Sequence, residues 1–310
     1  MKEMRNYIIG ILLFASSIGF AQQTPQTSFF TQNRATWNAA FTGMNEQISV
    51  NTFVRQQWLG FGLDAPRTVS LDFQYPFVEL NMAAGAAIHY DQTGPVSKRG
   101  VNLNYAYQIK DLGLNDGQLN FGIMAGGHQY VFNPSNQVVN NDGDPLLETG
   151  NQTAFYPSIG GGMFYLSSTE TYRNNTNFYA GLSFQQAYET NVLVGQYNQK
   201  RISHTIFDLG SRIYGYNYMI EPSISVNLTT PEIIDVLLGV TFEMRDKFWA
   251  GAGYSSIQEL ALQGGYIIED VGGRDTRLKL GVLGNIGLGE KLEDFGPGAE
   301  LFIRYEFDMD

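Results

Sequence analysis

From residue 47 to the end of the chain, apolar and polar residues alternate with a period of two. Val101, Leu103 and Tyr105, for example, alternate with Asn102 and Asn104. This period is typical of β-strands that have one apolar and one polar face. It predicts fourteen strands, at 47–57, 67–76, 81–90, 99–109, 118–131, 154–166, 176–187, 204–214, 218–228, 233–243, 247–255, 259–268, 277–287 and 299–308.

The lengths of these segments favour a membrane protein. A tilted strand needs about 9–11 residues to cross a bilayer, whereas strands of soluble proteins have about 5–6. Charged residues make up only 16% of the chain, below the roughly 25% of soluble domains. The charges inside the segments fall mostly on the polar face, which suits a lumen: Arg55, Asp72, Glu221, Asp235, Lys279 and Arg304.

These features together predict an all-β fold, a transmembrane antiparallel up-and-down β-barrel of about 14 strands. An even strand number and closure are expected because open sheet edges do not occur in lipid. The alternative is a soluble sheet whose strands are weakened by glycine pairs such as Gly126-Gly127.

The N-terminus predicts export. Lys2 and Arg5 precede an apolar stretch at 7–20, and Gly19 and Ala21 are small residues suited to a cleavage site. We therefore expect a signal peptide at 1–21, read by the Sec pathway, and localisation in a bacterial outer membrane. The alternative is a membrane-anchor helix, for which 14 residues are short.

Three parts are expected: the signal peptide, an N-terminal arm at 22–46 and a barrel domain at 47–310. The arm has no clear period, and we leave open whether it extends into the periplasm or is tucked into the lumen. With both termini in the periplasm, the two longest connections, 132–153 and 188–203, lie outside, as outer-membrane barrels prefer.

Strand 299–308 should close the barrel against strand 47–57, with Arg55 and Glu300 paired in the lumen. Tyr305 and Phe307 lie on the apolar face of this last strand. Alternating aromatics there resemble the signal by which barrel-assembly machinery recognises outer-membrane proteins, so we assign both residues to assembly.

Composition argues against several function classes. The chain has no cysteine, three histidines, and nineteen basic against thirty acidic residues, a net charge of −11. This excludes thiol chemistry and is unfavourable for nucleic-acid binding. No serine, histidine and acid stand at a catalytic spacing, so we expect no enzyme and no cofactor. The oxygen-rich loop 140–144 could hold calcium, although such clusters usually form turns.

The segment from Arg55 to Thr68, RQQWLGFGLDAPRT, is more specific than a generic connection. Trp58 and Phe61 offer apolar anchors, Gly60 and Gly62 allow positive backbone dihedrals, and Pro66 stiffens the exit. It is either a partner-binding or gating loop, or an ordinary tight loop with a girdle aromatic. The candidate residues of this loop are Arg55, Gln57, Trp58, Gly60, Phe61, Gly62, Pro66 and Thr68.

This segment resembles the PorP/SprF family of type IX secretion system outer-membrane proteins, whose members carry an Arg-x-Gln-Trp-x-Gly stretch followed by proline and threonine. The family also has an earlier Asn-Pro-Ala-Tyr-Ala-Gly-like motif. Here Asn38-Ala39-Ala40-Phe41-Thr42-Gly43 stands in its place and keeps Asn38, Ala40 and Gly43, but lacks the proline.

The resemblance implies a non-enzymatic part in type IX secretion, helping to secrete a partner protein or retain it at the surface, in some members for gliding. Implied partners are a secreted adhesin or enzyme with a sorting domain, other components of the system including periplasmic, peptidoglycan-linked ones, and the lipid bilayer. The acidic loop 142–148 would prefer a basic partner. The alternative function is a passive channel or hydrophobic-solute transporter.

Overall fold

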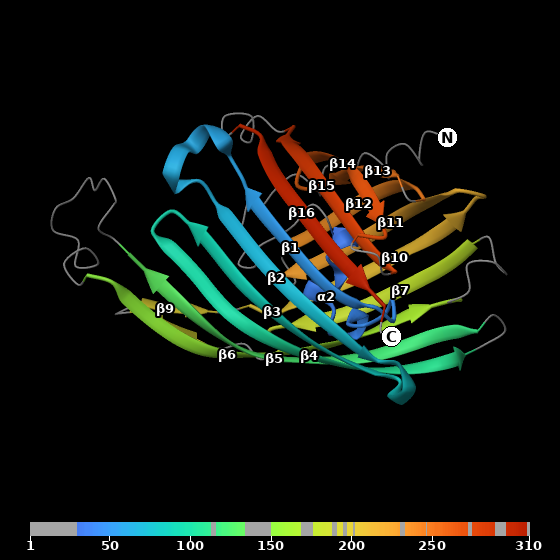
Figure 1. Ribbon diagram of the computed structural model, residues 1–310. Helices are drawn as coiled ribbons and strands as arrows, with labels where there is room; N and C mark the ends of the chain where they lie inside the picture. Colours follow the sequence, from blue (N-terminus) through green and yellow to red (C-terminus); the bar gives the residue numbers. More distant parts are fainter. Residues whose placement is uncertain are drawn as a thin grey trace, which may run out of the picture.

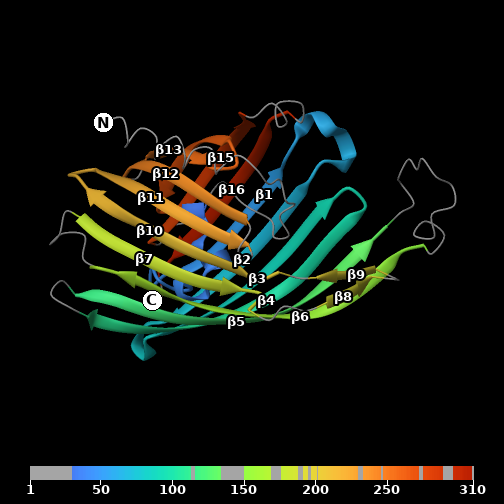
Figure 2. The ribbon, with the colours of Figure 1, turned by 180° about the vertical axis from the view of Figure 1, so that it is seen from behind.

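In the computed structural model, the strands form one closed antiparallel barrel of fourteen strands, in the order β1-β16-β15-β14-β13-β12-β11-β10-β7-β6-β5-β4-β3-β2 (Figures 1 and 2). The structure describes residues 30–112, 116–133, 150–168, 176–187, 191–194, 197–200, 202–229, 233–245, 247–271, 275–288 and 296–308. Among these residues, no helix is long and apolar enough to cross a membrane.

Each of the fourteen predicted strands is present. Their bounds are β1 Ile48–Gln56, β2 Arg67–Phe77, β3 Met82–Thr93, β4 Val96–Leu112, β5 Gly117–Phe132, β6 Gln152–Leu166, β7 Thr176–Gln185, β10 His204–Tyr214, β11 Tyr218–Thr229, β12 Ile233–Met244, β13 Phe248–Ser255, β14 Glu259–Glu269, β15 Thr276–Gly287 and β16 Gly298–Phe307. The part of the chain that the structure describes also has five short helical segments: η1 Phe30–Gln32, α2 Arg34–Trp37, η2 Ala39–Phe41, η3 Leu59–Asp64 and η4 Val78–Leu80.

Two predicted connections differ from the structure. The connection 91–98, which the predicted strands 81–90 and 99–109 leave between them, is mostly strand, since β3 runs to Thr93, β4 starts at Val96, and the ladder continues to that point. The expected loop 188–203 contains a small hairpin, β8 Asn191–Val194 with β9 Tyr197–Lys200. Hairpin ladders extend further than the alternation of side chains, because backbone hydrogen bonds do not require an apolar face.

The predicted closure is confirmed. β16 pairs antiparallel with β1, from Ile48 opposite Phe307 to Gln56 opposite Ala299. Arg55 lies opposite Glu300, and its Nε is 3.1 Å from the Glu300 carboxylate inside the barrel. The seam is therefore held by a backbone ladder and by an ion pair shielded from bulk water.

The two faces of the wall differ as the alternation predicts. On β4 and β5, Leu103 and Ile123 point outward and are 62% and 65% exposed, whereas Asn104 faces the lumen and is 8% exposed. The predicted lumen charges Arg55, Asp72, Glu221, Asp235 and Lys279 are all buried. An apolar outer surface around a polar interior is the arrangement of a transmembrane barrel, so the predicted fold class is confirmed.

Candidate functional site: a plug in the lumen and a charged vestibule

Residues 30–46, the plug, lie inside the barrel, where Figure 1 shows the blue helical segment around α2 enclosed by strands. The plug packs Ala40 and Phe41 against Phe164 and Tyr179 of the wall. Phe41 and Phe164 meet edge to face, with ring centroids 5.1 Å apart. The sequence left open whether the N-terminal arm extends into the periplasm or is tucked into the lumen, and in the structure residues 30–46 of the arm lie in the lumen. The plug lies near the barrel end where β1 starts and β16 ends, which we call the terminus end; the other end is the rim.

Asn38 connects the plug to the wall. Its Oδ1 accepts a hydrogen bond from the Ala40 backbone N–H at 3.0 Å, which caps η2. Its Nδ2 donates to the carbonyl oxygens of Met163 at 3.1 Å and Leu182 at 3.4 Å, on β6 and β7. One side chain therefore both starts a helical turn and fixes that turn against two strands.

Gly43 ends the plug at a position that requires glycine. Its φ is +66°, and a Cβ there would overlap the Cβ of Ala83. Its N–H donates to Gln74 at 3.0 Å, and its carbonyl accepts from Gln108 at 3.1 Å. The left-handed turn lets the chain leave the plug and enter β1.

Gly122 of β5 lets the plug approach the wall. A Cβ on Gly122 would overlap the backbone of Ala39 and Ala40, and Ala40 is fully buried. The retained motif residues Asn38, Ala40 and Gly43 thus share one role, which is to seat the plug.

We expect Gly122→Ala to loosen the plug while the barrel stays closed, because the added methyl group occupies the place of the plug backbone. Single-channel recording in planar bilayers should show larger ion conductance than the wild-type protein. Gly284→Ala is the matched control, since a Cβ on Gly284 meets no atom within 4 Å. Equal conductance of the two variants would contradict the seating role of Gly122.

Arg34 holds the plug to the neighbouring strands β7, β10 and β11. Its Nε donates to Asp208 of β10 at 2.7 Å, and its Nη2 donates to Glu221 of β11 at 2.7 Å and to the Tyr179 hydroxyl at 2.5 Å. The guanidinium also lies over the Tyr179 ring, 4.3 Å from its centroid. Burial opposes the charge of Arg34, but the carboxylates of Asp208 and Glu221 outweigh it and raise the pKa of the guanidinium.

We call this group, Arg34, Asp208, Glu221 and Tyr179, the latch. The sequence analysis did not identify it, although one signal was present. Arg34 is the one charged residue between 22 and 45. A single charge in a long uncharged segment that ends up buried must find partners of opposite sign. The sequence analysis placed Glu221 on the polar face of its strand, but it did not single out Asp208 as its neighbour in the lumen.

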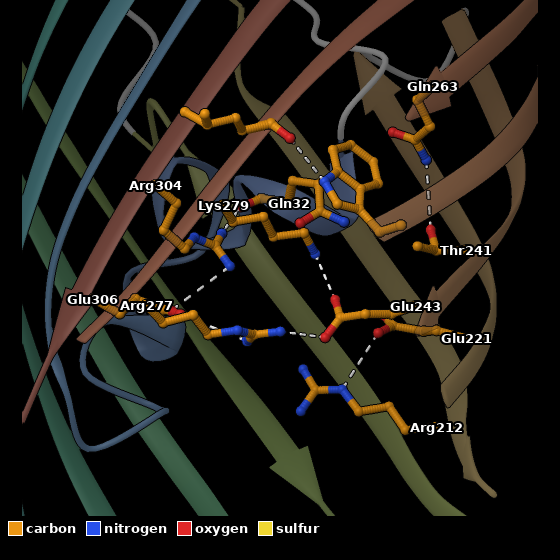
Figure 3. A network of polar contacts seen from close by, with 12 residues as sticks. Gln32, Arg212, Glu221, Thr241, Glu243, Gln263, Arg277, Lys279, Arg304 and Glu306 are labelled. Atoms are coloured by element: carbon orange, nitrogen blue, oxygen red, sulfur yellow. Dashed lines mark hydrogen bonds and ion pairs between the residues drawn. The ribbon is translucent and has the colours of Figure 1, made fainter. Parts of the chain in front are cut away.

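A cavity of about 450 Å³, the vestibule, lies at the terminus end between the plug and β10–β16. Figure 3 shows its charged side chains: Lys279 Nζ donates to Glu243 at 2.7 Å, and Arg277 bonds to the other oxygen of the same carboxylate. Arg304 donates to the carbonyl of Gln32 in the plug and through Nε to Asn51 at 2.6 Å. The lining is polar, which is unfavourable for an apolar solute.

The first loop forms a compact turn at the rim. The Gln57 N–H donates to the Pro66 carbonyl, and the Leu59 N–H to the carbonyl of Pro297, each at 2.9 Å. The rings of Trp58 and Phe61 are 6.0 Å apart. Leu59 and Phe61 are each 52% exposed, and Trp58 is half-buried.

The candidate loop residues fall into two groups. Arg55 and Thr68 belong to the lumen wall, where the Thr68 hydroxyl donates to Asp91 at 2.7 Å. Gly62 has the expected positive φ, at 70°, but Gly60 does not; Trp58 adopts φ of 50° instead. Gly60 lies in η3, close to Gly296, so its small size serves an approach between two chain segments.

The structure also brings together one serine–histidine pair, which spacing along the chain did not reveal. Ser70 and His89 are cross-strand partners in the lumen, with Oγ 3.0 Å from Nδ1. Among the described residues, no carboxylate is hydrogen-bonded to His89. The loops at 140–144 and 142–148, and the expected signal peptide at 1–21, lie outside the described residues.

The strand number, the apolar outer face and the polar, plugged lumen define a β-barrel of the outer-membrane class. The sequence model of the family described as type IX secretion system membrane protein PorP/SprF matches residues 19–305. The chain belongs to this family. A comparison with curated proteins found no match.

Solved structures share the barrel fold. The CymD monoaromatic hydrocarbon channel has a TM-score of 0.54 at 10% identity, with 94% of this chain and 95% of that chain covered. A FadL homologue from Pseudomonas aeruginosa has a TM-score of 0.49 at 8% identity, covering 85% and 90%. CdiB from Acinetobacter baumannii has a TM-score of 0.46 at 9% identity. The match covers 84% of this chain, and this chain spans 60% of the length of CdiB.

Proposed function

We propose that this barrel acts in type IX secretion without catalysis, by helping a partner protein reach or stay on the cell surface. In this proposal the terminus end faces the periplasm and the rim faces outward, after export directed by residues 1–21. The partner is a secreted adhesin or enzyme with a sorting domain, and periplasmic components of the system meet the terminus end.

The observation that carries the proposal is the rim loop, residues 57–66. Backbone bonds from Gln57 and Leu59 hold it in one conformation, while Leu59 and Phe61 stay half exposed. Apolar groups held on a rigid element are suited to bind a protein, because little conformational entropy is lost on binding. The plug and the charged vestibule support this reading over a conduit for hydrophobic solutes.

We expect the double change Trp58→Ala with Phe61→Ala to abolish surface display of the cognate substrate while the barrel stays folded at normal abundance. Aromatic anchors commonly contribute about 2 kcal/mol or more to an interface, and a loss of about 2.7 kcal/mol is roughly a hundredfold in affinity. The measurement is substrate on the surface and in the medium, normalised to folded barrel. Pro66→Gly should have a weaker effect in the same direction, because it loosens the loop.

Tyr216→Ala serves as the control, since Tyr216 is 98% exposed in the β10–β11 turn at the opposite end of the barrel. It removes a comparable ring without touching the rim. Undiminished display in the Trp58 and Phe61 double variant, at equal barrel abundance, would return this loop to the role of a connector.

A further inference from the structure

The vestibule carries an excess of positive charge in an acidic protein. Its lining includes six basic and four acidic side chains, although the whole chain has nineteen basic and thirty acidic residues. The basic residues are Arg34, Arg212, Arg245, Arg277, Lys279 and Arg304, and the acidic ones are Glu221, Glu243, Glu269 and Glu306.

Two of these acidic groups, Glu221 and Glu243, already have several partners each. Glu221 accepts from Arg34 and from the Tyr179 hydroxyl, and lies 3.4 Å from Arg212. Glu243 accepts from both Lys279 and Arg277. These carboxylates therefore have little capacity left to bind another cation.

Two arginines, by contrast, retain unused donors. Arg212 reaches Glu221 only through Nε, and among the described residues its two terminal nitrogens have no partner. The guanidinium of Arg245 has none within the same part of the chain. Both side chains line the vestibule, and in Figure 3 the Arg212 side chain points into the lumen. Planar guanidinium groups with free Nη atoms bind carboxylates and phosphates through paired hydrogen bonds.

We propose that the vestibule binds a polypeptide segment rich in carboxylates, which enters from the terminus end. Arg212 and Arg245 would take its carboxylates, and the neutral polar groups of the lining would bond to its backbone, among them Thr31, Asn45 and Thr241. The four glutamates of the lining disfavour a dianionic phosphate group more than a monoanionic carboxylate. The cavity, about 450 Å³, is within the usual range of roughly 300–1,000 Å³ for ligand sites.

The test uses the full mature protein in a neutral detergent and a short fluorescent peptide in which aspartates alternate with glycines. Fluorescence polarisation should show saturable binding that weakens in about 1 M salt, where the screening length is only about 3 Å. A peptide with asparagine at every aspartate should not bind. Equal binding of the two peptides would overturn the proposal.

Substitutions locate the site. Arg245→Gln should weaken peptide binding by about tenfold, as expected for the loss of charge-assisted hydrogen bonds. The double variant, Arg212→Gln with Arg245→Gln, should weaken it by more than tenfold. Arg245 has no side-chain partner among the described residues, so its replacement leaves the latch intact. Arg99→Gln is the matched control, because Arg99 is exposed on β4 and bonds to Gln129 away from the vestibule.

Unchanged affinity of the Arg245→Gln variant, with heat-modifiable migration showing a folded barrel, would overturn the assignment. Displacement of the peptide by millimolar inorganic phosphate, with the same dependence on Arg245, would overturn the ligand class and indicate a phosphate site. Both results are independent of surface display, which reports on the rim loop at the other end of the barrel.

Discussion

Replacing Arg34 with methionine should destabilise the folded protein more than any other single change at the plug. Arg34 is 3% exposed and binds Asp208, Glu221 and Tyr179 at once. Its loss leaves buried carboxylates without their main partner, and breaking a buried ion pair typically costs about 3–5 kcal/mol. The temperature at which the heat-modifiable band shifts on gels should fall strongly, and the lumen should conduct ions.

A triple variant separates the effect of charge from that of packing. Arg34→Met with Asp208→Asn and Glu221→Gln removes the unpaired charges and keeps similar side-chain volumes. Its stability should return most of the way to the wild-type value, because neutral replacements of a buried ion pair are often tolerated. An Arg34→Met variant with unchanged stability would show that the latch does not hold the plug.

Outer-membrane levels should collapse when Tyr305 and Phe307 are both replaced by aspartate. The two rings lie on the outer face of β16, 5.6 Å apart, and on the opposite parity from the buried Glu306. Lost burial of two rings and added charge on the lipid face together cost several kcal/mol. The measurement is the amount of folded barrel in the outer-membrane fraction.

Tyr216→Asp is the control for this pair, because it also replaces an aromatic ring by aspartate, but in a fully exposed turn. It should leave the level of folded barrel unchanged. A wild-type level in the Tyr305 and Phe307 double variant would mean that the membrane does not contact this face of β16.

The barrel wall was predictable from the sequence because the residues of each strand indicate which of its faces meets lipid and which meets the lumen. Alternation marks which side chains of β4 or β15 face lipid, and closure requires that the first and last strands pair. The Arg55–Glu300 pair followed from these two facts and from the position of both residues near the same end of their strands. The alternation within one strand can be interpreted without knowing which other strands lie beside it.

The plug and the vestibule were not predictable in the same way. The plug consists of turns of three or four residues, too short to show a period. Its position depends on Asp208, 174 residues away from Arg34, and on the absence of a side chain at Gly122. Parity places Glu243 and Arg277 in the lumen, but their contact depends on how far along the barrel axis each one lies.

The plug also bears on how the chain folds. It precedes β1, yet it contacts β5, β6, β7, β10 and β11, so its seat exists only when strands from both halves of the chain have their final register. A slip of one residue in β5 or β10 would turn Gly122 or Asp208 to the lipid side. Such a slip would turn the polar face of the whole strand toward lipid, and it would also remove Gly122 or Asp208 from the position that contacts the plug. The contacts of the plug therefore stabilise the native register of β5 and β10 relative to a register shifted by one residue.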